Sequence, residues 1–144
     1  MHITLESDYA VRIVDCLAAA PGRMDAKSIA SQTGVTPRFS LKILHKLVAS
    51  GLVRSYKGAR GGYELARAAN EITLRDVIET VEGVYALSRC VDPAQSCKCE
   101  AQSCRRDACR FHRVYDEVSE LVRQRLSEVT FGDVSDSVEQ EPLL

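Results

Sequence analysis

Apolar residues recur at helical spacing through the first fifty residues of the chain. Between residues 7 and 20 they line one face of a helix, and its members are Tyr9, Ala10, Ile13, Val14, Leu17 and Ala18. Pro21 and Gly22 follow, and both residue types favour the end of a helix. Asp25 is placed to cap a second, short helix over residues 26–32.

A turn and a third helix come next. Gly34 supplies the turn, Thr36 is the predicted N-cap, and Pro37 takes the first helical position, where its missing N–H is not needed. We expect the helix to run to about Ser50 and to end at Gly51. Its candidate core residues are Leu41, Ile43, Leu44, Leu47 and Val48. Two short helices joined by a tight turn predict a helix-turn-helix.

Two short stretches after this helix alternate between apolar and polar residues, as strands do. They are residues 52–56 and 62–65, and the glycine-rich tip KGARG, which carries two cations, lies between them. This order of elements predicts a mainly α fold with a small β-hairpin wing, which is a winged helix-turn-helix over residues 1–82.

The second half of the chain predicts two further helices. Thr73 and Asp76 form a capping-box pair at the start of the first of them. A longer helix is expected over residues 107–131, and its apolar stripe consists of Phe111, Val114, Tyr115, Val118, Leu121, Val122, Leu126 and Val129. So long a stripe on so small a domain indicates a homodimer with a long dimerisation helix. The alternative is that the stripe covers the winged helix of its own chain. Residues 132–144 are acidic and aperiodic, so we expect a disordered tail.

Charge is divided unevenly along the chain. Residues 1–65 hold nine Lys or Arg against five acidic residues, whereas the remainder holds ten against fifteen. A basic first half favours contact with double-stranded DNA over an ordinary scatter of surface charge. The candidate DNA-binding residues on the third helix and the wing are Arg38, Ser40, Lys42, Arg54, Lys57, Arg60 and Gly61. We find no nucleophile–base pair or phosphate-cradling motif, so an enzyme is not expected.

Five cysteines lie between Cys90 and Cys109, and His112 follows them closely. No apolar run approaches the roughly 20 residues that span a bilayer, and charges interrupt the N-terminal region where a signal peptide would be apolar. We therefore expect a cytoplasmic protein without membrane contact, whose thiols are kept reduced and bind metal rather than form disulfides. An iron–sulfur cluster, a zinc ion and a thiol redox switch are all compatible with this segment. Cys16, beside the apolar face of the first helix, is expected to be a small buried residue.

Several segments resemble the Rrf2 family of bacterial transcription regulators over roughly residues 1–134. They are Ser7-Asp8-Tyr9-Ala10, LKILHKLVASGLVRSYKGARGGYELA, ITLRDVIETVEG, the spaced cysteines before a long helix, and VTFGDV. The resemblance implies a dimeric winged helix with a long dimerisation helix. Some members of the family hold a [2Fe–2S] or [4Fe–4S] cluster, and others have no cluster.

The resemblance also implies a set of cluster ligands within a sensor loop over residues 83–110. Cys109 with His112 matches the family's Cys-x-x-His ending, and Cys90 matches its first cysteine. Cys104 is the favoured middle ligand, and Cys97 or Cys99 are alternates. The fourth ligand is expected to be His112, or Asp8 from the partner's first helix; a spare cysteine is a further alternative. A sample prepared in air is expected to lack the cluster.

These observations predict a dimeric DNA-binding repressor that senses redox state, nitric oxide or iron–sulfur status through its cluster. The alternative is a cluster-free regulator of the same family that responds to thiol oxidation, to zinc, or to a protein or small-molecule partner. Some members carry an acidic residue in the recognition helix where this chain has Leu41. A ligand-dependent switch between two operator classes is therefore not expected.

Overall fold

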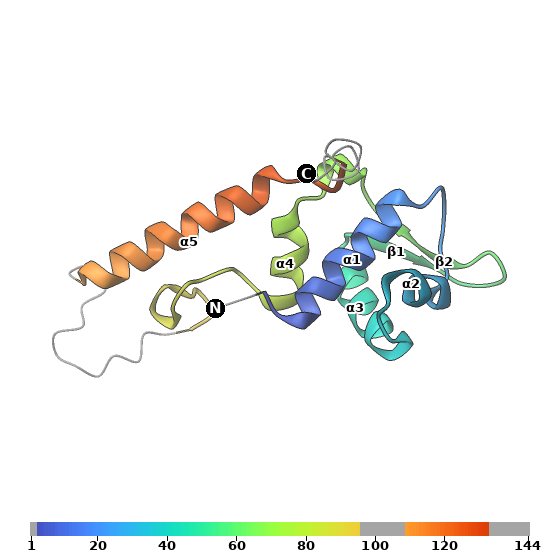
Figure 1. Ribbon diagram of the computed structural model, residues 1–144, viewed down its shortest axis with the longest axis horizontal. Helices are drawn as coiled ribbons and strands as arrows, with labels where there is room; N and C mark the ends of the chain where they lie inside the picture. The colour runs from blue at the N-terminus through green and yellow to red at the C-terminus, as the bar shows by residue number, and fades with distance from the viewer. Residues whose placement is uncertain (1–2, 96–108, 133–144) are drawn as a thin grey trace, which may run out of the picture.

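Helices and one antiparallel hairpin make up the described part of the chain, residues 3–95 and 109–132 of a computed structural model. The elements in order are α1 (Leu5–Ala19), α2 (Ala26–Thr33), α3 (Pro37–Ala49), β1 (Val53–Tyr56), β2 (Gly62–Leu65), the 3-10 turn η1 (Ala69–Glu71), α4 (Leu74–Glu82), the 3-10 turn η2 (Arg89–Val91) and α5 (Arg110–Glu128). The first four helices gather around one core beside the hairpin, and α5 extends away from them (Figure 1). The predicted winged helix-turn-helix is confirmed.

Side-chain caps fix where the helices begin. Asp25 accepts a hydrogen bond from the Ser28 backbone N–H at 2.9 Å, and Thr36 caps α3 with Pro37 in its first turn. Thr73 and Asp76 form the predicted reciprocal capping box of α4. At α1 the cap is Thr4, so this helix begins two residues earlier than the apolar pattern indicates. Each cap satisfies backbone N–H groups that have no partner inside the helix.

A single hydrophobic core joins all the elements of the winged helix. Its fully buried large side chains are Ile13, Val14, Ile29, Ile43, Leu44, Leu47, Val53, Ile72 and Val77. Phe131, which follows α5, is also buried in this core. The chain after α5 is therefore anchored on the winged helix, and backbone hydrogen bonds from Leu74 to Val129 and from Phe131 to Ile72 hold it there.

The hairpin pairs Val53 with Leu65 at its base and Tyr56 with Gly62 near its tip. The segment before α2 adds an isolated β-bridge to β2, because Met24 and Tyr63 exchange backbone hydrogen bonds of 3.0 and 2.8 Å. Gly62 is required at this crossing. Its φ is +138°, and a Cβ there would lie 2.7 Å from the Met24 carbonyl oxygen. The wing is thus tied to the chain ahead of α2.

Candidate DNA interface and sensor segment

The outer face of α3 differs from its prediction at two neighbouring residues. Ser40 is completely buried, so the prediction that it reaches DNA from the solvent face is wrong. Leu41 is 42% exposed, so its assignment to the core is also wrong. The reason is helical phase: Ser40 shares one face with Ile43, Leu44 and Leu47, at spacings of three, four and seven. The polarity of Ser40 and the apolar character of Leu41 suggest the opposite burial, but their positions along the helix determine which of the two is buried.

The exposed face of α3 therefore carries Arg38, Leu41, Lys42 and His45. Leu41 and His45 on this face are residues that the sequence analysis did not assign to the interface. The phase of the buried residues was the signal that could have found them, because i+1 and i+5 from a buried Ser40 lie outside the core face. The face thus offers cations, an imidazole and an apolar side chain side by side.

Lys42 is engaged with α1 as well as with solvent. Its Nζ lies 3.3 Å from Glu6 Oε1, and the Nζ of Lys46 lies 2.8 Å from the same oxygen. The two ammonium groups, Lys46 first, hold the pKa of Glu6 below its ordinary value despite partial burial. Lys42 is therefore a shared charge that links α3 to α1, and Arg38 is the less constrained cation of this face.

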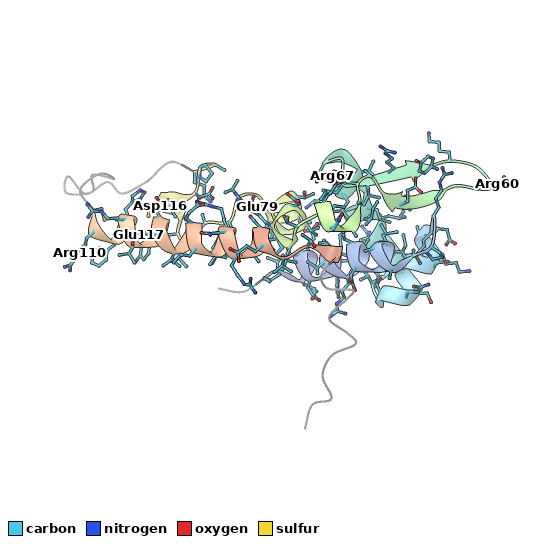
Figure 2. The ribbon with its side chains drawn as sticks, turned by 90° about the horizontal axis from the view of Figure 1, so that it is seen from above. Arg60, Arg67, Glu79, Arg110, Asp116 and Glu117 are labelled. Carbon is cyan, nitrogen blue, oxygen red and sulfur yellow. The ribbon has the colours of Figure 1, made fainter. Side chains whose placement is uncertain are left out.

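The wing presents its predicted cations to solvent. Lys57 and Arg60 are exposed at the tip, and Arg54 is exposed on β1 opposite Glu64. Figure 2 shows Arg60 at one extreme of the molecule, far from Arg110 at the start of α5. Gly61 lies so close to the Tyr56 carbonyl that a side chain would collide with backbone there. The tip is thus a tight turn whose shape depends on glycine.

Three of the predicted sensor residues lie in described segments. Cys90 is in η2, which packs against α5, and Cys109 is the N-cap residue of α5. Both thiols are half-buried and free. His112 is in the first turn of α5, and its Nδ1 is buried without a hydrogen-bond partner among the described residues. Cys90 Sγ contacts the Ser88 hydroxyl at 3.4 Å.

The remaining predicted ligands are placed differently. Cys97, Cys99 and Cys104 lie outside the described residues. Asp8 is on α1, where it forms an ion pair of 2.9 Å with Arg12. Within residues 3–95 and 109–132 no three His, Cys, Asp or Glu side chains are grouped so that they could hold a metal. The described part of the chain thus contributes at most a partial ligand set.

Cys16 is half-buried rather than buried, a correction to its prediction. Its thiol contacts the Met24 sulfur at 3.8 Å and the Gln32 side-chain oxygen at 3.5 Å. Burial and the nearby Asp15 raise the pKa of this thiol. A thiol held protonated in this way is a poor metal ligand.

Polar groups attach α5 to its own chain. The Ser119 hydroxyl accepts a hydrogen bond of 2.9 Å from the Leu87 backbone N–H, and Arg123 donates to the Tyr85 carbonyl at 2.9 Å. Ser119 is the buried residue of α5. The segment between α4 and η2 therefore covers the Ser119–Arg123 side of the helix.

The apolar stripe of α5 is only partly covered, and its half-buried members are Tyr115, Val118, Val122, Leu126 and Val129. Phe111 is 55%, Val114 52% and Leu121 66% exposed, and no apolar side chain of α5 is fully buried. Figure 1 shows the helix projecting well beyond the winged helix. Within the described residues, Phe111, Val114 and Leu121 are thus not covered by the winged helix of their own chain.

A winged helix-turn-helix with cations on its recognition helix and wing is the architecture of a DNA-binding transcription regulator. The chain belongs to the Rrf2 family, described as iron-dependent transcriptional regulators, because the model of that family matches residues 3–137. The description of this family is that of transcriptional regulators, not of enzymes.

Relatives and solved structures agree with this assignment. The chain is 36% identical to Protein aau3 of Rhizobium meliloti (strain 1021) over 96 residues, which are 66% of this chain and 62% of that protein. It is 38% identical over 91 residues to the HTH-type transcriptional regulator Rv1287 of Mycobacterium tuberculosis (strain ATCC 25618 / H37Rv), covering 62% of this chain and 56% of that protein. The chain thus spans about three fifths of the length of these relatives.

Two solved structures share the fold. One is CymR, the global cysteine regulator of B. subtilis, with a TM-score of 0.73, 22% identity, and coverage of 94% of this chain and 97% of that one. The other is IscR of T. potens, with a TM-score of 0.73, 23% identity, and coverage of 100% and 94%. Among the described helices, none is long and apolar enough to cross a membrane.

Proposed function

We propose that this chain is a cytoplasmic, homodimeric DNA-binding repressor that holds an iron–sulfur cluster and alters its DNA affinity when the cluster is lost or reacts. The observation that carries this proposal is that Cys90 lies in η2, which packs against α5, and that Cys109 and His112 lie at the start of α5. A change in the ligation of these residues would act directly on α5, the helix that connects the sensor segment to the proposed dimer interface.

The donor set fits a cluster. Thiolates are the usual ligands of iron–sulfur clusters, and imidazole can replace one of them. His112 Nδ1 is buried without a partner among the described residues, and this is the condition of a nitrogen that a metal would satisfy. Cys104, or else Cys97 or Cys99, would complete the three thiolates, and His112 or Asp8 would be the fourth ligand. When bound, the cluster supplies one-electron redox chemistry and reactivity toward oxygen or nitric oxide.

The dimer follows from the two faces of α5. One face forms polar contacts with its own chain through Ser119 and Arg123, whereas Phe111, Val114 and Leu121 on the other are exposed. A second copy that packs along this stripe removes apolar surface from water. Two-fold symmetry then places two copies of α3 for adjacent half-sites about one helical turn of DNA apart.

The DNA contacts follow from α3 and the wing. We assign Arg38 and His45 to the major groove, Arg60 to the minor groove or a phosphate, and Leu41 to an apolar contact with a thymine methyl group. Leu41 is an exposed large apolar residue on the same face as Arg38, Lys42 and His45. The proposal therefore includes a preference for thymine within each half-site.

Two binding experiments test the DNA assignments. A duplex selected from a random pool should bind the wild-type protein, and Arg60→Ala should weaken binding to all sequences and lower the salt slope by about one. Replacing thymine by deoxyuridine in the half-site should weaken the wild-type protein but not Leu41→Ala. Unchanged binding after Arg60→Ala sinks the wing assignment, and equal sensitivity to uridine in both proteins sinks the Leu41 assignment.

The ligand assignment is tested by anaerobic purification of single variants. Cys90→Ala and Cys109→Ala should lose the visible absorption and the iron, whereas Cys16→Ala should retain both. His112→Ala should alter the spectrum if His112 is the fourth ligand, and Asp8→Ala should do so if Asp8 is. A colourless wild-type protein with stoichiometric zinc, or with no metal, contradicts the cluster.

A further inference from the structure

Arg23 makes three contacts with the wing although it lies before α2. Its guanidinium carbon is 3.3 Å from the centre of the Tyr56 ring, and its Nε lies 3.7 Å from Glu64 Oε2. Its Nη1 donates a hydrogen bond of 3.3 Å to the backbone carbonyl of Arg60. One side chain thus touches β1, β2 and the tip.

These contacts involve the parts of the hairpin that most need support. A two-stranded hairpin is marginally stable by itself in water. In this protein the hairpin consists of β1 and β2, and the Met24–Tyr63 β-bridge is its extension beyond these two strands. Arg23 is next to Met24 in the chain. Its stack on Tyr56 and its hydrogen bond to the Arg60 carbonyl therefore attach the wing to this segment closer to the tip.

The chemistry of these contacts is specific to arginine. A planar guanidinium can stack on an aromatic ring while its N–H groups reach a carboxylate and a carbonyl in different directions. A lysine at this position would keep the charge but could not satisfy the three partners together. The side chain is 41% exposed, so it contributes little to the core and much to the placement of the tip.

We propose that Arg23 is a positioning residue that holds the wing so that Arg60 is presented to DNA. This inference rests on the proposed DNA-binding function. Arg23 acts through Arg60 and does not itself supply the phosphate contact, because its N–H groups are directed to Glu64 and to the Arg60 carbonyl.

A double-mutant cycle in DNA binding tests the coupling. With a mixed-sequence duplex at fixed salt, Arg23→Ala should bind roughly fivefold more weakly and Arg60→Ala roughly tenfold more weakly. The double variant should stay near tenfold, because Arg23 has nothing to position once Arg60 is gone. Additive losses of about fiftyfold, or a further fall of the salt slope when Arg23 is replaced in the Arg60→Ala protein, would overturn the inference.

Arg23→Lys separates the positioning role of the guanidinium from the effect of its positive charge on DNA binding. It should bind DNA as weakly as Arg23→Ala, whereas wild-type affinity in this variant would mean that charge alone matters and would overturn the proposal.

A measurement without DNA tests the same inference independently. Amide hydrogen exchange at Gly61 and Tyr63 should be faster in both Arg23→Ala and Arg23→Lys than in the wild-type protein. Arg12→Ala is the matched control, since Arg12 also pairs with a carboxylate and lies near an aromatic ring, but on α1. It should leave exchange in the wing unchanged. Unchanged exchange in the Arg23 variants refutes the positioning role, and failure of the wild-type protein to bind any DNA refutes the proposed function instead.

Discussion

In the winged helix, α1, α2, α3 and α4 bury their apolar residues against one another, whereas α5 leaves its apolar stripe exposed. The two regions have similar helical patterns but different surroundings. The winged helix buries its core residues completely, while α5 forms hydrogen bonds with its own chain through Ser119 and Arg123. The burial of the first region is therefore complete within one chain, whereas the exposed part of the α5 stripe is the surface on which the proposed second copy would pack.

The largest expected effect is in the core of the winged helix. Leu44→Ala should lower the free energy of unfolding by about 2–5 kcal/mol, because a fully buried side chain is lost and a cavity remains. Urea denaturation measures this change. Leu41→Ala, one turn away on the exposed face, is the control and should change stability by less than about 0.5 kcal/mol. Equal costs at the two positions would mean that the phase of α3 is wrong.

On α5 an apolar residue of the exposed stripe should affect the association of two chains rather than the stability of one. Leu121→Asp places a charge on the exposed stripe and should raise the dimer dissociation constant roughly 100-fold, since the charge would be buried in the interface. Analytical ultracentrifugation measures the shift toward monomer. Gln124→Asp adds the same charge at an exposed position off the stripe and should leave the dimer intact. If Leu121→Asp remains dimeric at low concentration, the interface lies elsewhere.

The smallest effect concerns a helix cap. The Ser28 backbone N–H, with the Ser28 hydroxyl, holds the pKa of Asp25 below its ordinary value of 3.8. A lowered folded-state pKa stabilises the fold above the unfolded-state pKa, and this contribution is lost as the pH falls through the folded-state pKa. Asp25→Asn, which keeps a neutral cap, should lower the melting temperature by about 1–2 °C at pH 7.

The pH dependence checks that assignment. The difference between Asp25→Asn and the wild-type protein should close below pH 3.8, in the range where Asp25 becomes protonated. A difference that persists at lower pH would show that the charge of Asp25 is not its source.

Local signals predicted most of the fold. The caps at Asp25, Thr36 and Thr73 and the glycine-rich tip were read from neighbouring residues, and the structure confirms them. The predictions for Ser40 and Leu41 are wrong because they rest on the polarity of the side chain and not on its position around the helix. The spacing of Ser40 from Ile43, Leu44 and Leu47 is the local signal that places Ser40 on the core face and Leu41 outside it.

The contacts of Arg23 could not be predicted. Its partners Tyr56, Arg60 and Glu64 lie more than thirty residues further along the chain, and no spacing rule connects them. Likewise, no local pattern predicts that His112 Nδ1 is buried without a partner among the described residues. The identity of the middle cysteine ligand remains a prediction, since its candidates lie outside the described residues.

The most direct test of the account is the DNA affinity of one anaerobic sample before and after its cluster is removed by a chelator. The proposed function predicts at least two irons per subunit before chelation. Removal of the cluster should then change the operator affinity by roughly 5- to 150-fold and leave the dimer intact. Equal affinity in the two states, or a protein without iron, would contradict the claim that the sensor segment acts on DNA binding through α5.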